Sequence, residues 1–90
     1  MKKKILIIGS TGMLGSAVLN EFTTHSDFEI FATYRNKKDV ELLKKKFNHK
    51  FLNVNWYKFD IKKNYQQRLK KICKRKDYII NCVGVIKPYI

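Results

Sequence analysis

Three glycines spaced three residues apart stand between a short apolar run and an amphipathic segment near the start of this chain. Gly9, Gly12 and Gly15 form GSTGMLG, directly after the run KILII at 4–8. An apolar, β-branched run of this kind predicts a parallel strand that is covered on both faces. From Met13 onward the apolar residues recur at helical spacing, which predicts a helix over about 13–24. The glycines therefore mark a strand-to-helix turn, and folds built from βα units become the ones to consider.

The rest of the chain continues the same alternation of strands and helices. We expect further strands at 29–34, 55–61 and 78–86, with helices at 37–48 and after residue 64. Alternating elements of this kind are typical of right-handed βαβ units and a parallel sheet. The predicted fold class is α/β: a partial Rossmann fold with about four strands in the order 3-2-1-4 and helices on both faces.

The glycines predict a binding site for a phosphate group at the first turn. Gly9 would allow the sharp turn after the strand, Gly12 would let the backbone approach a pyrophosphate, and Gly15 would let the helix pack closely. The free N–H groups and the dipole of the helix would then face the phosphate. The spacing is GxxGxxG, one residue longer at the first gap than the GxGxxG fingerprint. The alternative is that the glycines serve turn geometry alone.

Three further positions at strand ends predict contacts with a dinucleotide. Arg35 follows the second strand, where an acidic residue would bind the ribose of NAD, and a guanidinium there favours the 2′-phosphate of NADP over NAD. Asp60, with the N–H of Ile61, would bind the adenine, although Asp60 could instead initiate the third helix. Gly84 in NCVGV would leave room for the ribose and nicotinamide half. A surface arginine in a lysine-rich turn is the alternative for Arg35.

Size and composition limit the remaining choices. The chain has 90 residues, enough for one domain, and a formal net charge of +13. Such a charge can indicate nucleic-acid binding, but the lysines fall mostly on the polar faces of the predicted helices, so we do not expect nucleic acid as a partner. No apolar run is long enough for a signal peptide core or a membrane span. Two cysteines without metal-ligand spacing, Cys73 and Cys82, predict a cytoplasmic protein with reduced thiols and no metal site.

The segments GSTGMLG, ATYR, FDI and DYIINCVGVIKP together resemble the extended short-chain dehydrogenase/reductase family. Within that family they are most similar to the sugar-nucleotide reductases of the dTDP-4-dehydrorhamnose reductase type, and the resemblance covers essentially the whole chain. It implies an NADP-dependent oxidoreductase that transfers hydride to a keto-sugar nucleotide. The cofactor-binding residues that it implies are Gly9, Thr11, Gly12, Met13 and Leu14 for the pyrophosphate, Arg35 for the adenosine phosphate, Asp60 and Ile61 for the adenine, and Cys82, Val83 and Gly84 for the ribose side.

The resemblance implies that the catalytic half of such an enzyme is missing from this chain. The family's Tyr-x-x-x-Lys pair would follow the fourth strand, whereas Tyr34 and Lys38, which match the spacing, fall on the adenosine side and are not expected to be catalytic. His25 and His49 are isolated and are expected on the surface. Residues 1–90 are thus predicted to be the N-terminal, NAD(P)-binding portion of a larger reductase, inactive alone, with the substrate bound only in the complete protein.

The apolar fourth strand supports an alternative. A strand of this composition should have a neighbour on each edge, and an open apolar edge favours association. The chain would then be a free-standing NADP-binding or sensing module that forms a homodimer through this edge.

Overall fold

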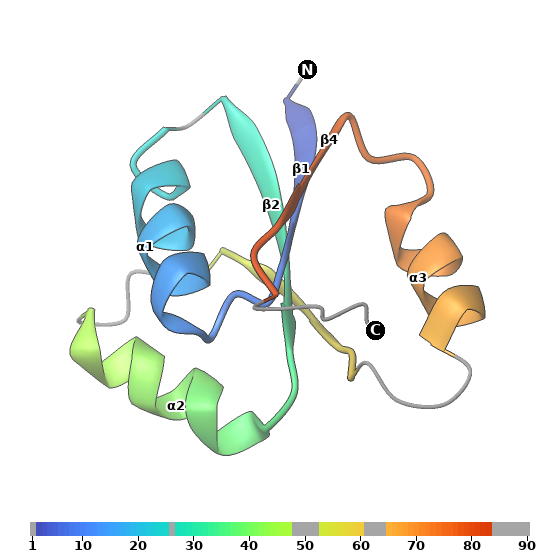
Figure 1. Cartoon of the computed structure of the whole chain (residues 1–90). Coiled ribbons are helices and arrows are strands. Elements are labelled where there is room, and N and C mark those ends of the chain that lie inside the picture. The colour runs from blue at the N-terminus through green and yellow to red at the C-terminus, as the bar shows by residue number, and fades with distance from the viewer. Residues whose placement is uncertain (1, 26, 48–52, 61–64, 84–90) are drawn as a thin grey trace.

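A computed structural model describes residues 2–25, 27–47, 53–60 and 65–83. Strands and helices alternate through these residues as predicted (Figure 1). The elements are β1 (Lys3–Ile8), α1 (Met13–Phe22), β2 (Phe28–Tyr34), α2 (Lys37–Lys46), β3 (Asn55–Lys58), α3 (Tyr65–Cys73) and β4 (Tyr78–Asn81). The four strands form one parallel sheet in the order β3-β2-β1-β4. The predicted α/β fold and its strand order are therefore confirmed.

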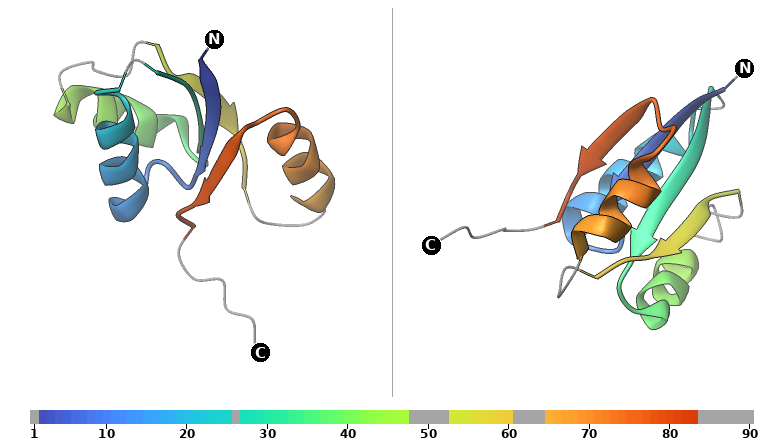
Figure 2. Two further views of the ribbon diagram at one scale, coloured as in Figure 1. Left: turned by 90° about the horizontal axis from the view of Figure 1, so that it is seen from above. Right: turned by 90° about the vertical axis from the view of Figure 1, so that its right-hand side faces the viewer.

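The helices form a layer on each side of the sheet. α1 and α2 lie together on one face, and α3 lies alone on the other (Figures 1 and 2). Right-handed βαβ connections produce this arrangement, because the crossover from β3 to β4 must pass over the face opposite to that of the first two helices.

The apolar residues of β1 supply both halves of the core. Ile5 and Ile7 face α1 and α2, where they pack with Leu19 and Leu43 among others, and the alternate residues Leu6 and Ile8 pack against Phe31, Phe59 and Ile72 on the α3 face. The side chains of Ile5, Leu6, Ile7 and Ile8 are all buried. Burial of an aliphatic side chain of this size contributes about 1.5–3 kcal/mol. A strand with this burial on both faces has to be apolar at every position, which explains the unbroken ILII run.

The third and fourth strands are shorter than predicted, because each ends where its partner strand ends. β3 was expected over 55–61, but its last paired residue, Lys58, lies opposite Tyr34, the final residue of β2. β4 was expected over 78–86, but its last pair is Asn81 with Ile8, after which β1 turns away at Gly9. Residues 61 and 84–86 lie outside the described residues.

α1 also ends earlier than expected, at Phe22, and not at residue 24. The hydroxyl groups of Thr23 and Thr24 donate hydrogen bonds of 2.7 Å to the carbonyls of Asn20 and Glu21. Such hydroxyl-to-carbonyl bonds offer the last carbonyls a partner other than a further helical N–H group.

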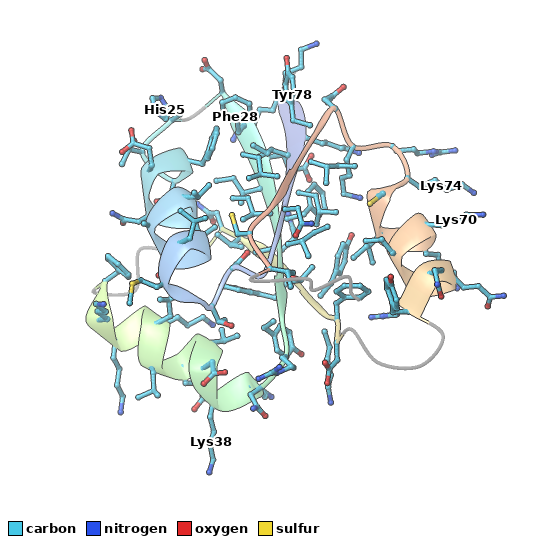
Figure 3. All side chains as sticks on the ribbon, viewed as in Figure 1. His25, Phe28, Lys38, Lys70, Lys74 and Tyr78 are labelled. Atoms are coloured by element: carbon cyan, nitrogen blue, oxygen red, sulfur yellow. The ribbon has the colours of Figure 1, made fainter. Side chains whose placement is uncertain are left out.

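β4 is an edge strand with exposed apolar side chains. Tyr78 is 52% exposed and Ile79 is 47% exposed, and in the described part of the chain β4 pairs with β1 alone. Tyr78 lies against Phe28 with ring centroids 6.3 Å apart, and both lie at the amino-terminal end of the sheet (Figure 3).

The lysine side chains that Figure 3 labels project into solvent. Lys38 points away from α2, and Lys70 and Lys74 point away from the α3 side of the molecule. Within the described residues, no helix combines the length and the apolar character that crossing a bilayer would require.

Candidate functional site

A cavity of about 390 Å³ lies at the carboxyl ends of the four strands. Its walls come from Gly9 after β1, Arg35 after β2, Asp60 after β3, and Cys82 and Val83 after β4. In open parallel sheets ligands bind at this end, where the connections on either side of the first strand run in opposite directions. The volume falls within the range of small-molecule sites, about 300–1,000 Å³.

Most of the residues predicted to contact a dinucleotide meet at this cavity. Those that line it are Gly9, Thr11, Gly12, Arg35, Asp60, Cys82 and Val83. Met13 and Leu14 do not, and their side chains are 93% and 63% exposed. Ile61 and Gly84 lie outside the described residues. That these residues line one cavity is consistent with a single binding site. The role of each residue in that site stays a prediction.

The turn after β1 is held by the second strand. The N–H of Gly9 donates a 2.8 Å hydrogen bond to the hydroxyl oxygen of Thr33, and the N–H of Ser10 donates to the Thr33 carbonyl at 3.2 Å. The Ser10 hydroxyl in turn donates to the carbonyl of Ile7 at 2.7 Å. Thr33 is 1% exposed. These bonds fix the path of the backbone from the strand into the loop.

The structure explains the presence of glycine differently at each of the three positions. Gly9 has a φ of +81°, a region that other residues rarely adopt, and a Cβ there would lie 3.0 Å from the backbone of Cys82 and Val83. A Cβ on Gly15 would lie 1.9 Å from the carbonyl oxygen of Gly9. A Cβ on Gly12 would meet only that oxygen, at an ordinary 3.7 Å. The fold requires glycine at 9 and 15, whereas at 12 it leaves open space beside the cavity.

The first turn of α1 directs backbone donors toward the same place. Gly12 is the N-cap residue, with φ −77° and ψ 177°, and the first helical hydrogen bond runs from the N–H of Ser16 to the Gly12 carbonyl at 2.9 Å. The N–H groups of residues 13–15 precede that bond, and the N-cap glycine has no side chain with which to cap them. Met13 and Leu14 were predicted as pyrophosphate contacts, and these N–H groups are what they could offer, since their side chains point outward.

The balance of positive and negative charge at the cavity differs from that of the chain as a whole. Arg35 is exposed, while Asp39 and Asp60 are half-buried, and all three line the cavity. Asp39 lies in the first turn of α2, where a carboxylate interacts favourably with the helix dipole. One guanidinium and two carboxylates thus face the cavity of a protein whose net charge is +13.

Cys82 lies at the end of the cavity formed by β4. Its N–H donates to the carbonyl of Ile8 at 2.8 Å, and the Asn81 side chain accepts a 3.0 Å bond from the N–H of Val83. Burial raises the pKa of the Cys82 thiol above its usual value. The raised pKa favours the neutral form of this half-buried thiol near neutral pH.

Four lining residues did not emerge from the sequence: Thr33, Tyr34, Asp39 and Phe59. Thr33 could have been found, because a hydroxyl directly after the apolar residues IFA predicts a buried hydrogen-bond partner. Asp39 could also have been found, as the one acid among the first residues of a lysine-rich helix.

The structure describes three of the four side chains that we considered and did not expect to be catalytic. Tyr34 lines the cavity, but Lys38 points into solvent. His25 is exposed, with Nε2 3.5 Å from a carboxylate oxygen of Glu21 on the same helix. His49 lies outside the described residues. Among the residues that are described, no three His, Cys, Asp or Glu side chains are grouped to hold a metal ion.

The sheet order, the glycine turn and the cavity at the carboxyl ends define a dinucleotide-binding Rossmann domain. The chain belongs to the family described as "Saccharopine dehydrogenase NADP binding domain", whose pattern it matches over residues 5–88. NADP is therefore the cofactor. The residues fit it, because the space beside Gly12 admits the close approach of a phosphate and Arg35 supplies a cation at the wall.

Solved structures of other proteins share this fold. Pen from Bacillus thuringiensis is similar at 26% identity and a TM-score of 0.76, over 93% of this chain and 25% of that protein. The PbgP3 protein from Burkholderia pseudomallei shares the fold at 24% identity and a TM-score of 0.70, over 98% of this chain and 27% of that one. An NADPH-bound carbonyl reductase from chicken fatty liver does so at 18% and 0.65, over 99% and 37%.

The chain spans about a quarter of the first two of these proteins. No curated protein sequence matches it.

Proposed function

We propose that this chain is the NADP-binding portion of a sugar-nucleotide oxidoreductase of the extended short-chain dehydrogenase/reductase type, similar to dTDP-4-dehydrorhamnose reductase. The observation that carries the proposal is that one cavity is lined by the glycine turn, Arg35, Asp60 and the end of β4. The segment NCVGVIKP, which resembles that reductase branch, supports the choice of substrate class.

Each wall of the cavity has a proposed task. The N–H groups at the start of α1 bind the pyrophosphate, because they lack helical partners and lie at the positive end of the helix dipole. The guanidinium of Arg35 pairs with the 2′-phosphate. Asp60 accepts a hydrogen bond from the adenine amino group, and Cys82 and Val83 lie beside the nicotinamide ribose.

The bound cofactor supplies the hydride that, together with a proton, converts a keto group into an alcohol. The residues of this chain hold and orient the cofactor, and they include no expected proton donor for the keto oxygen. We therefore expect the chain alone to oxidise no NADPH in the presence of a 4-keto-sugar nucleotide. Turnover by the isolated chain would contradict this part of the proposal.

The binding site is tested by fluorescence titration of the chain with NADPH and NADH. We expect NADPH to bind more tightly, and Arg35→Gln to weaken NADPH binding about tenfold while NADH binding changes little, as expected for the loss of a charge-assisted hydrogen bond. Lys38→Gln is the matched control, because Lys38 loses the same charge on a side chain that points into solvent. If NADPH does not bind, or if the two variants behave alike, the proposed site is wrong.

A second candidate function rests on the exposed edge of β4. Because Tyr78 and Ile79 are about half exposed on an edge strand, a second copy that pairs there would make this chain a free-standing, dimeric NADP-binding module. Sedimentation equilibrium should then show a dimer that Ile79→Lys dissociates. A monomer at high concentration would contradict this alternative and leave the first proposal intact.

A further inference from the structure

The side chain of Asp39 lies at a position that the cofactor-binding pattern does not account for. A second cavity, of about 510 Å³, opens between α1 and α2 beside the first, and Thr11, Gly12 and Asp39 line both. Asp39 is therefore part of the wall between the two, next to the glycine turn. Arg35, which follows β2, lines the first cavity alone.

The immediate surroundings of Asp39 do not neutralise its charge. Its backbone N–H donates to the Asn36 carbonyl at 3.0 Å, which places it in the first turn of α2. In the part of the chain that the structure describes, no ion pair within 4.0 Å holds its carboxylate. The helix dipole explains why an acid is tolerated here. It does not remove the repulsion between this carboxylate and a phosphate brought into the same cavity.

Arg35 and Asp39 have opposite effects on a ligand that carries an extra phosphate. A 2′-phosphate would gain from the guanidinium and lose from the carboxylate, whereas a 2′-hydroxyl would experience neither effect strongly. The same helix carries a second acid, Glu41, which is exposed and lines neither cavity. Asp39 and Glu41 therefore carry the same charge on the same helix, but only Asp39 lines the cavities.

We propose that Asp39 is a specificity-determining residue that restrains the preference for NADP, so that the unphosphorylated dinucleotide remains a ligand of the same site. The inference rests on the proposed function, because it assumes that the adenosine ribose lies beside Arg35. It makes Asp39, on α2, a determinant of the ratio between the affinities for NADP and NAD, in addition to the residues at the strand ends.

The test compares Asp39→Asn with Glu41→Gln, each of which removes one negative charge from α2. Dissociation constants for NADPH and NADH are measured by fluorescence titration, and those for 2′,5′-ADP and ADP by calorimetry, on the whole 90-residue chain. Removal of one nearby charge from a screened site should tighten NADPH and 2′,5′-ADP binding about three- to tenfold in Asp39→Asn. NADH and ADP share the pyrophosphate but lack the 2′-phosphate, so their binding should tighten less than that of NADPH and 2′,5′-ADP. Glu41→Gln should change the affinity for none of the four by more than about twofold.

A second neutral substitution guards against a folding defect. Thermal unfolding of each variant shows whether α2 is intact, and Asp39→Ser is used if the asparagine lowers the melting temperature. Equal effects of the Asp39 and Glu41 substitutions, or an equal gain for all four nucleotides, would overturn the inference while leaving the cofactor site in place. Failure of the unmodified chain to bind NADPH would instead overturn the proposed function.

Discussion

Substitution of Gly12 by alanine should separate binding from folding. The added Cβ would meet one atom, the carbonyl oxygen of Gly9 at 3.7 Å, which is an ordinary contact. The backbone angles of Gly12, φ −77° and ψ 177°, are accessible to alanine. The methyl group nevertheless enters the cavity wall at the start of α1, where the backbone N–H groups are proposed to bind the pyrophosphate.

The expected magnitudes for Gly12→Ala differ between the two properties. Alanine is a poorer N-cap than glycine but restricts the unfolded chain, and these effects oppose each other, so the free energy of unfolding should change by less than about 1 kcal/mol. Displacement of a phosphate from one charge-assisted hydrogen bond costs about 1.5–3 kcal/mol, so NADPH should bind at least about tenfold more weakly.

Gly15→Ala is the matched control, because the same methyl group is added one turn later. Its Cβ would lie 1.9 Å from the Gly9 carbonyl oxygen and 2.9 Å from the Cα of Ser10. Backbone atoms must move to relieve this, which costs about 1–3 kcal/mol or more out of a total stability of about 5–15 kcal/mol. Urea unfolding should therefore detect Gly15→Ala and not Gly12→Ala, and NADPH titration should detect both. Unchanged NADPH affinity in a folded Gly12→Ala variant would refute the reasoning.

Three further expectations concern the frame of the site. Thr33→Val should lower the free energy of unfolding by about 1–3 kcal/mol in urea titration, because the N–H of Gly9 loses its acceptor, whereas Thr33→Ser should retain most of the stability. Leu19→Ala, at a fully buried position, should cost about 2–5 kcal/mol in the same assay. The folded chain holds the Cys82 proton more tightly than the unfolded chain, since burial raises the thiol pKa. Stability should therefore fall as pH rises above about 8.5, and less steeply in Cys82→Ser.

The sequence predicted the fold well because the fold depends on patterns that are local. A short, unbroken, β-branched apolar run favours a strand covered on both faces, and ILII in β1 is such a strand. The order of the strands then follows if the sheet is of the Rossmann kind, and right-handed connections decide which face each helix covers. The ends of β3 and β4 could not be predicted in this way. Each is decided by the last residue of a neighbour, Tyr34 or Ile8, that is distant in the sequence.

The candidate site was predictable where the backbone forms it and where a strand ends, as at Arg35 and Asp60. The glycine spacing indicates a turn and free N–H groups, and these features depend on the absence of side chains at Gly9, Gly12 and Gly15. Thr33 and Asp39 reach the site through their place in the folded molecule, one across the sheet and one from α2. No spacing rule connects Thr33 and Asp39 to the glycines. Their position at the cavity is therefore visible only in the folded structure.

The charge of the chain illustrates why a sum over the sequence misleads about a site. A net charge of +13 suggests strong attraction for any polyanion, and at long range that field would raise the rate of encounter with a dinucleotide. The cavity itself is lined by one arginine and two aspartates. Nearby charges are screened less than distant ones, so we expect Arg35 and the two acids to have the larger effect on which nucleotide stays bound. On this reasoning the lysines would affect the rate of encounter with a ligand, and the residues that line the cavity would determine which ligand stays bound.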